Sequence, residues 1–264
     1  MTLIRSLRFF SLRALLLAFL CAAAPPFTER AMAHDTWLLP KIFRLKSEQR
    51  VELALTSGMA FPKNNHAIKA ERINKAFLAL AGERIQFPRF EPRAAYLGIP
   101  FAPSNVGVGT AFVELEPKTL ELSPKQVRGY LREIGAHDSL QAFWKTVRSG
   151  NPSEGGARWR ETYSKHTKTF VFVGDDASIS ADSSWKMPVG MKLEIVPERH
   201  PGLLKANDEL PIRVLLDGKP LENFTVGVVR ENDRHGFTLR TDSAGRARIR
   251  LGKAGRYLLR GTLL

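Results

Sequence analysis

The chain has 264 residues, 40 lysines and arginines against 26 acidic residues, and a formal net charge of +14. This length suits one large domain or two small ones with buried cores. A single cysteine, Cys21, excludes an internal disulfide and a thiolate metal cluster. The basic residues are spread along the chain, a pattern that favours contact with an anionic cell-envelope surface over nucleic acid, which we do not expect as a partner.

Residues 1–33 have the features of a secretion signal. Arginines precede an apolar run over residues 14–24, which is about as long as a signal core and shorter than the roughly 20 residues that span a membrane. Small residues at Ala31 and Ala33 then form a cleavage site that would leave His34 first. We therefore expect a soluble periplasmic or secreted protein with no membrane span after signal removal.

Signal removal also changes the composition. The segment carries Cys21, four arginines and one glutamate. Its loss leaves a chain without cysteine and with a net charge of about +11. Any metal site in the mature protein must then be built without thiolate ligands.

Short strands are expected from residue 34 to about residue 116. Residues 51–55 alternate with period two, residues 77–80 and 110–115 are also strand-like, and proline and glycine separate these segments. This pattern is typical of a β-sandwich. We expect an N-terminal β-sandwich domain over residues 34–190.

The period changes within that domain. Ser123 followed by Pro124 is a strong helix start, because serine caps and proline fits the first turn. Further helices are expected over residues 140–147 and 157–166. A small α-helical insert over about residues 123–166 is therefore predicted.

The chain returns to strands from residue 191. Residues 193–196, 209–216 and 225–230 are strand-like, and glycine-containing turns separate the strands of this part. The spacing indicates an immunoglobulin-like or transthyretin-like sandwich over residues 191–264. The predicted fold is thus mainly β, with two such domains.

The first residue of the mature chain is the sharpest candidate for chemistry. Cleavage before His34 would put a free amine, with a pKa near 7.7–8.0, beside an imidazole on one residue. Together they could chelate nickel, cobalt, copper or zinc. His66 lies in a loop of the same domain and is the best second ligand, while Asp35 could add an oxygen.

Other sites have weaker support. His166 and His200 have the flanking residues of ordinary surface positions, and His235 lies at an expected hairpin tip. The nucleophile-elbow, zincin and P-loop signatures are absent, so we expect no enzymatic activity. The paired carboxylates Asp175 and Asp176 lie in a predicted hairpin turn.

Several segments resemble the exported proteins of domain-of-unknown-function family 4198. They are AHDTWLLP at residues 33–40, VLLDGKPL at residues 214–221 and TDSAGR at residues 241–246. The last two are similar to carboxypeptidase-regulatory and transthyretin-like modules. The resemblance implies an exposed histidine after the signal and, for some members, a link to periplasmic nickel or cobalt uptake.

The leading hypothesis is accordingly a periplasmic metal-binding accessory protein that serves an inner-membrane metal transporter. The first alternative is a non-catalytic binding or scaffolding module without metal, and the second is a copper histidine-clamp protein. Similar proteins usually continue past the strand at residues 256–260. We therefore also expect that this chain is truncated at Leu264, which would leave an unpaired sheet edge.

Overall fold

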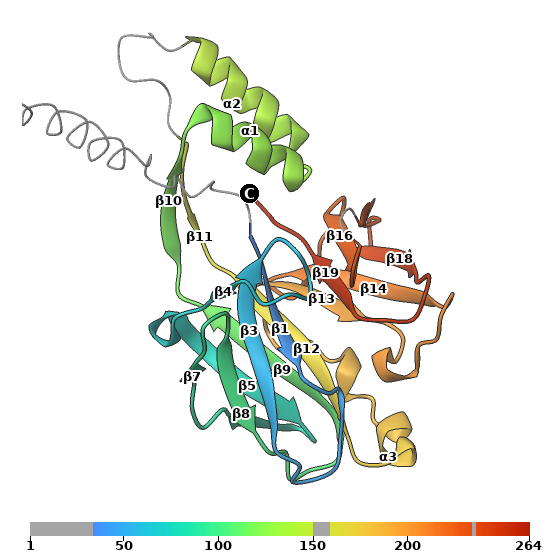
Figure 1. Cartoon of the computed structure of the whole chain (residues 1–264). Helices are drawn as coiled ribbons and strands as arrows, with labels where there is room; N and C mark the ends of the chain where they lie inside the picture. Colours follow the sequence, from blue (N-terminus) through green and yellow to red (C-terminus); the bar gives the residue numbers. More distant parts are fainter. Residues whose placement is uncertain (1–33, 150–158, 234–235) are drawn as a thin grey trace, which may run out of the picture. The chain divides into compact units, whose positions relative to one another are not determined.

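The computed structural model describes residues 34–149, 159–233 and 236–264 (Figure 1). The predicted signal, with Ala31 and Ala33, lies outside the described residues, as does His235. Among the helices that the structure describes, none is long and apolar enough to cross a membrane. All described residues belong to one unit, residues 32–264.

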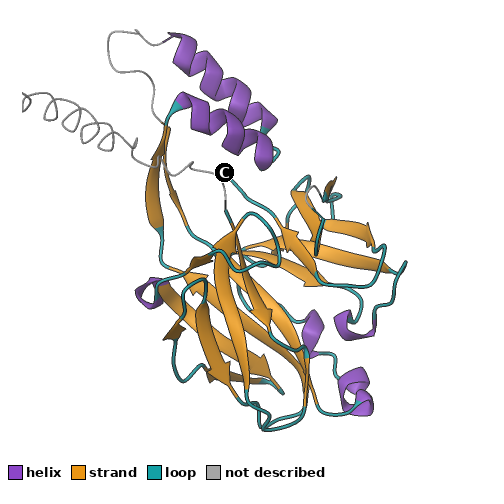
Figure 2. Ribbon diagram, viewed as in Figure 1, coloured by secondary structure: helices purple, strands orange, loops and turns teal. Residues whose placement is uncertain are grey.

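The mainly β prediction is confirmed, since strands far outnumber helices (Figure 2). Two β-sandwiches follow each other along the chain. The first contains β1 (Asp35–Pro40), β2 (Arg44–Leu45), β3 (Val51–Gly58), β4 (His66–Ala67), β5 (Ile73–Leu80), β6 (Glu83–Gln86), β7 (Glu91–Pro92), β8 (Leu97–Phe101), β9 (Gly107–Leu115) and β12 (His166–Val173), with a 3-10 turn, η1 (Ala70–Arg72).

These strands form two five-stranded sheets. One has the order β1-β3-β8-β7, with β4 also paired to β3, and the other has the order β2-β12-β9-β5-β6. Every second side chain of a strand faces the core, so Leu53 and Leu55 of β3 are fully buried. They share one hydrophobic cluster with Leu78 of β5, Val113 of β9 and Val171 of β12, which packs the two sheets face to face.

A two-stranded ribbon carries the helices of the insert. The ribbon is β10 (Lys118–Leu122) with β11 (Trp159–Tyr163), and the helices are α1 (Pro124–Glu133) and α2 (His137–Ser149). The Ser123 start is confirmed, because the Ser123 backbone N–H donates to the Gln126 side chain, 2.9 Å away, in a capping box. Gly135, at φ +72°, ends the first helix in the left-handed conformation that glycine accepts.

The helix expected over residues 157–166 is wrong. Residues 159–163 form β11, and His166 already belongs to β12. The exposure of β11 alternates along Trp159–Tyr163, a period of two that follows from its pairing with β10. The helical part of the insert is therefore α1 and α2 alone among the described residues.

The second sandwich contains β13 (Leu193–Pro197), β14 (Glu209–Leu216), β15 (Lys219–Pro220), β16 (Thr225–Arg230), β17 (Phe237–Arg240), β18 (Arg246–Arg250) and β19 (Tyr257–Arg260). One sheet has the order β13-β14-β15 with β18 also on β14, and the other has the order β17-β16-β19. Ile212, Val226 and Ile249 anchor its separate core. Whether the domains divide at residue 190, and whether the module is transthyretin-like, stay predictions.

Short helices flank β13, the first strand of the second sandwich. They are α3 (Asp176–Ala181) and the 3-10 turns η3 (Ser184–Lys186) and η4 (Pro201–Leu203). The hairpin turn expected at Asp175 and Asp176 is wrong, because the Asp175 side chain accepts the Ser178 N–H at 2.8 Å and caps α3.

A buried ion pair joins β12 to β13. The Lys168 ammonium lies 2.5 Å from the Glu194 carboxylate, and the Glu194 side chain is only 1% exposed. The same carboxylate accepts backbone N–H groups of Val189, Gly190 and Met191 at 2.9–3.1 Å. These bonds satisfy a charge that would otherwise be costly to bury, and they fix the segment that enters the second sandwich.

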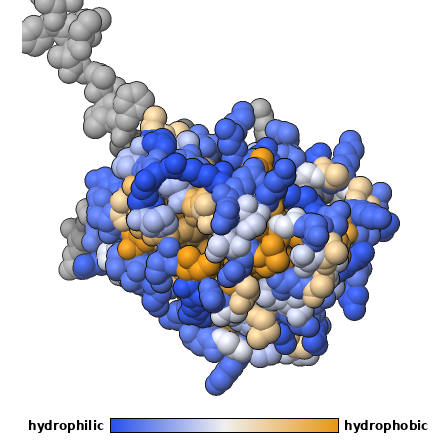
Figure 3. Space-filling view, turned by 90° about the horizontal axis from the view of Figure 1, so that it is seen from below, coloured by the Kyte–Doolittle hydropathy of each residue, from blue (hydrophilic) through white to orange (hydrophobic). Residues whose placement is uncertain are grey.

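The face drawn in Figure 3 is largely hydrophilic, with small apolar areas between polar side chains.

Candidate functional site

The strand register places His34 beside His66. His34 directly precedes β1, and β3 lies between β1 and β4. Thr36 and His66 both lie opposite Ser57 of β3, so they share one face of this sheet. The imidazole rings of His34 and His66 stack with centroids 5.0 Å apart and planes 15° from parallel. The two histidines singled out in the sequence are therefore neighbours.

Lys165 binds the backbone of His34. Its ammonium donates to the carbonyl oxygen of His34 at 2.5 Å. Lys165 directly precedes β12, and its own carbonyl accepts the Leu115 N–H, which fixes it at the end of the sheet. Burial lowers the pKa of Lys165 to about 8, although the charge of Asp35 opposes this shift.

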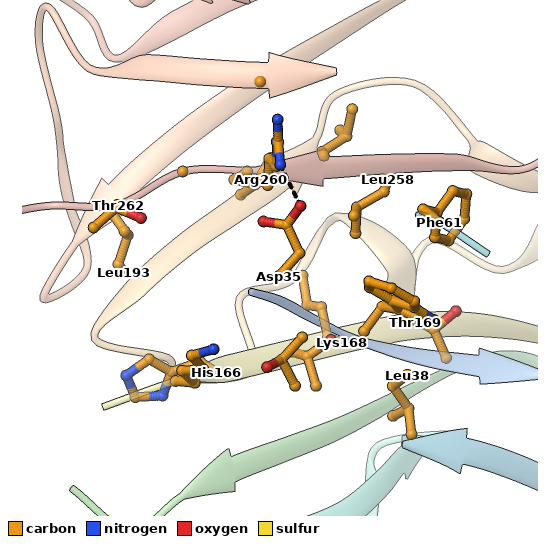
Figure 4. A pocket seen from close by; sticks show the side chains of 18 of the residues that line it. Asp35, Leu38, Phe61, His166, Lys168, Thr169, Leu193, Leu258, Arg260 and Thr262 are labelled. Carbon is orange, nitrogen blue, oxygen red and sulfur yellow. Dashed lines mark hydrogen bonds and ion pairs between the residues drawn. The ribbon is translucent and has the colours of Figure 1, made fainter. Parts of the chain in front are cut away.

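Asp35 lies apart from this pair. Adjacent strand residues face opposite sides, and the Asp35 carboxylate is bound by the Arg260 guanidinium of β19 (Figure 4). Burial raises the pKa of Asp35 above its ordinary value, even though Arg260 acts in the other direction. Because Arg260 occupies its carboxylate, the structure does not bring Asp35 together with His66.

The described part of the chain contains no group of three or more histidine, cysteine or acidic side chains placed to hold a metal ion. The pair His34 and His66 supplies two imidazoles. A third nitrogen would have to come from the backbone, which is the amine that cleavage before His34 would free. The two rings and this amine form the donor set that the sequence predicts.

A sequence-family comparison identifies the family of the chain. The family model described as "Domain of unknown function (DUF4198)" matches residues 31–262. The chain belongs to this family. The match starts close to His34 and spans both sandwiches, and the family description assigns no ligand or activity.

Other comparisons add little to the DUF4198 assignment. No curated protein matches the chain. Among solved structures, the D0-D1 domain of intimin is 12% identical, covers 85% of this chain and 88% of that chain, and has a TM-score of 0.21. Native alpha-2-macroglobulin from Escherichia coli, domains MG0-NIE-MG1, is 10% identical, covers 86% and 92%, and has a TM-score of 0.22.

Two histidines that the sequence placed at the surface of this DUF4198 protein are partly buried (His166) or buried (His200). The ring nitrogen Nδ1 of His166 lies 3.3 Å from the Glu114 carboxylate, and the His166 side chain is 13% exposed. Burial lowers the pKa of His166, and Glu114 opposes the shift. The prediction that His166 lies at the surface is wrong, because His166 is the first residue of β12 and lies opposite Glu114 of β9.

His200 is buried as well. Its Nε2 donates to the Ile179 carbonyl oxygen at 2.9 Å, and its Nδ1 accepts the Gly202 N–H at 3.1 Å. These two bonds fit a neutral ring with its proton on Nε2. His200 caps the turn η4. The Pro-Gly pair that follows His200 was the sequence signal of this turn, and the sequence-based prediction missed it.

A large cleft runs past this corner of the molecule. It has a volume of about 1550 Å³, and its lining includes His34, Lys165, β1, β12, β13 and β19. Figure 4 shows part of it, with Asp35 and Arg260 joined across the space and Lys168, Leu193 and Leu258 around them. The cleft thus adjoins His34 and extends along the second sandwich.

Proposed function

We propose that this DUF4198 protein is an extracytoplasmic accessory protein that binds nickel or cobalt through the N-terminal histidine of its mature form. In this proposal, the His34 amine, the His34 ring and the His66 ring hold the ion. The protein then presents it to an inner-membrane transporter. The observation that supports the proposal is the stacked His34–His66 pair, with ring centroids 5.0 Å apart.

The distance between the rings suits a shared ion. Metal–nitrogen bonds are about 2.0–2.1 Å long, so two nitrogens on one ion lie within about 4.2 Å of each other. Rings whose centroids are 5.0 Å apart can reach this spacing by rotation of their side chains, without movement of β1 or β4. Lys165 meanwhile holds the His34 carbonyl, which restricts the backbone that carries the amine.

Copper is the second candidate ion. The Irving–Williams order gives copper the higher affinity for nitrogen donors, so geometry alone does not favour nickel over copper. The neighbouring position of His66 supports a copper histidine clamp as directly as it supports a nickel site. The ion that the exported protein carries when it is purified from cells, identified by elemental analysis, separates the candidates.

The test begins with the exported protein. Mass spectrometry should show a first residue of His34. Isothermal titration of that protein with nickel or cobalt chloride should show one ion bound with a dissociation constant of about 1 µM or below, which corresponds to about 8 kcal/mol or more. A protein that retains Ala33 ahead of His34 should lose at least tenfold in affinity.

The second variant removes the other ring. His66→Ala should weaken binding by at least tenfold, while His137→Ala, in α2, should change it by less than twofold. Affinity should also fall from pH 8 to pH 6, because the amine and the two rings must lose protons before they bind the ion. Equal binding by the Ala33-extended protein would overturn the proposal. Absence of metal binding would favour a scaffolding module instead.

A further inference from the structure

The second sandwich is open on one side. β13 pairs with β14 alone and β19 pairs with β16 alone among the strands that the structure describes, so each is the edge of its sheet. The inward-facing residues of both edges, Leu193, Ile195, Tyr257 and Leu259, pack on the core of the second sandwich and are only half-buried. The same four residues line the cleft. The cleft therefore reaches this core between β13 and β19.

The outward faces of the same strands contact the first sandwich. Glu194 of β13 binds Lys168 of β12, and Arg260 of β19 binds Asp35 of β1. Leu258 packs with Trp37 and Phe61. In Figure 4, Lys168, Thr169 and Asp35 lie on one side of the space, with Leu258 and Arg260 on the other. The space is thus bounded by the edges of β13 and β19, by the core of the second sandwich, and by the polar side chains Lys168, Thr169 and Asp35 of the first sandwich.

Its size and charge limit what fits. The volume of about 1550 Å³ exceeds the range of about 300–1,000 Å³ that is typical of small-molecule pockets. The lining includes eight lysines and arginines but only two acidic residues, Asp35 and Glu161. Four of these basic residues, Lys192, Lys205, Lys253 and Arg256, are exposed, and Arg256 is already paired with Glu231. A long ligand that carries negative charge is favoured.

We propose that this cleft binds an extended acidic peptide segment of another polypeptide as an added strand on the free edge of β19. An unpaired edge offers backbone donors and acceptors to an incoming strand, while alternate side chains fill the pockets beside it. One face of the peptide places apolar side chains against Leu193 and Leu259. The other face turns carboxylates toward the exposed lysines of the lining, Lys192, Lys205 and Lys253. This inference does not depend on metal binding.

A peptide of alternating side chains tests the proposal. The probe is a fluorescein-labelled octapeptide of alternating valine and glutamate, titrated with residues 34–264 and followed by fluorescence anisotropy. We expect saturable binding at micromolar concentration. We also expect hydrogen exchange to slow at β19 but not at β13 when the peptide is bound, because a new strand ladder protects the amides of the edge that it joins.

Matched controls separate charge and backbone contributions. The same peptide with lysine for glutamate, and one with alternate amides N-methylated, should each bind at least tenfold more weakly. The double variant Lys192→Glu and Lys253→Glu should also lose at least tenfold. The double variant Lys125→Glu and Lys219→Glu makes the same charge change outside the cleft, and it should lose less than twofold.

Several outcomes would overturn the inference. Equal affinity for the N-methylated peptide would rule out an added strand, and equal affinity for the lysine peptide would rule out charge recognition. Absence of saturable binding by the folded protein, checked by circular dichroism, would also contradict it. Concentration-dependent dimers with slowed exchange at β19 would place a second copy of this chain in the cleft instead.

Discussion

The two sandwiches differ in how completely they enclose their cores. The first has two five-stranded sheets, and Leu53, Leu55 and Leu97 inside it are fully buried. The second has sheets of four and three strands. Ile212 and Ile249 at its centre are fully buried, but partly buried residues such as Leu193 and Leu259 make up a larger share of its described core cluster, seven beside nine buried residues against five beside seventeen in the first. Fewer strands leave apolar side chains in contact with the cleft. The first sandwich is therefore a scaffold that fixes His34 and His66, whereas the second retains an open side.

The junction between the sandwiches should show the largest effect. Glu194→Gln leaves the Lys168 ammonium buried without its counter-charge, and breaking one side of a buried pair costs about 3–5 kcal/mol. We expect urea denaturation to show this loss. Hydrogen exchange should quicken at β13 and β14 before it does at β3 and β9, because Glu194 lies in β13, which pairs with β14.

A surface pair supplies the control for this variant. Arg248 and Glu209 lie 2.7 Å apart, but their side chains are 74% and 50% exposed. Glu209→Gln should leave the free energy of unfolding almost unchanged, because water screens exposed pairs. Equal effects of Glu194→Gln and Glu209→Gln on the free energy of unfolding would mean that the buried Lys168–Glu194 pair stabilises the protein no more than an exposed pair does.

The same substitution in the two cores tests the comparison directly. Leu55→Ala creates a cavity in a closed core and should cost about 2–5 kcal/mol. Leu259→Ala, at the half-buried edge of the second core, should cost about 1 kcal/mol, because it removes less buried area. Equal losses in urea denaturation would mean that the second sandwich is as closed as the first.

Part of the fold and of the candidate site was predictable from the sequence. The strand at residues 51–55 was predicted from alternation, the strand at residues 209–216 from its strand-like run before a glycine turn, and α1 from Ser123 and Pro124. His66 was chosen as the partner of His34 because both lie in one domain. The register of β1, β3 and β4 that brings them together is set by long-range pairing.

The misses share one physical cause. His166 lies opposite Glu114 of β9, and the Asp35–Arg260 pair joins residues 225 positions apart. Burial and partners of this kind follow from tertiary packing, which local polarity does not report. The strand at residues 159–163 was missed for the same reason, because its partner is β10.

The Asp35–Arg260 contact can be tested from each side, because removing the carboxylate and removing the guanidinium should change stability by different amounts. The raised pKa of Asp35 means that its charge is partly uncompensated, so the folded protein holds the proton more strongly than the unfolded chain does. This contribution to stability is present below the ordinary pKa of 3.8 and is lost as the pH rises through the raised pKa. At pH 7, Asp35→Asn should therefore change stability by less than about 1 kcal/mol.

The reverse substitution should cost more. Arg260→Met leaves a partly buried carboxylate without its partner, and we expect a loss of about 2–3 kcal/mol in urea denaturation at pH 7. Asp35→Asn should also leave nickel affinity within twofold, since Asp35 faces away from His66. A tenfold loss of affinity in Asp35→Asn would restore Asp35 as a metal ligand.

The smallest effect concerns the ribbon and helices of the insert. Burial, with the charge of Glu161 beside it, raises the pKa of Tyr130 above its ordinary value of 10. The folded state then keeps a proton that the unfolded chain releases, so stability falls as the pH rises above 10. Tyr130→Phe should reduce this fall by less than about 1 kcal/mol, because partial exposure screens the effect. Urea denaturation between pH 9 and pH 11 measures the difference.

The central claim is that one ion joins the first residue of the mature chain to His66. A crystal of the exported protein, soaked in nickel chloride and measured at the nickel absorption edge, tests it most directly. The account predicts one strong anomalous peak within about 2.1 Å of the His34 amine, the His34 ring and the His66 ring. A peak at any other side chain, or none beside a well-ordered His34, would contradict it.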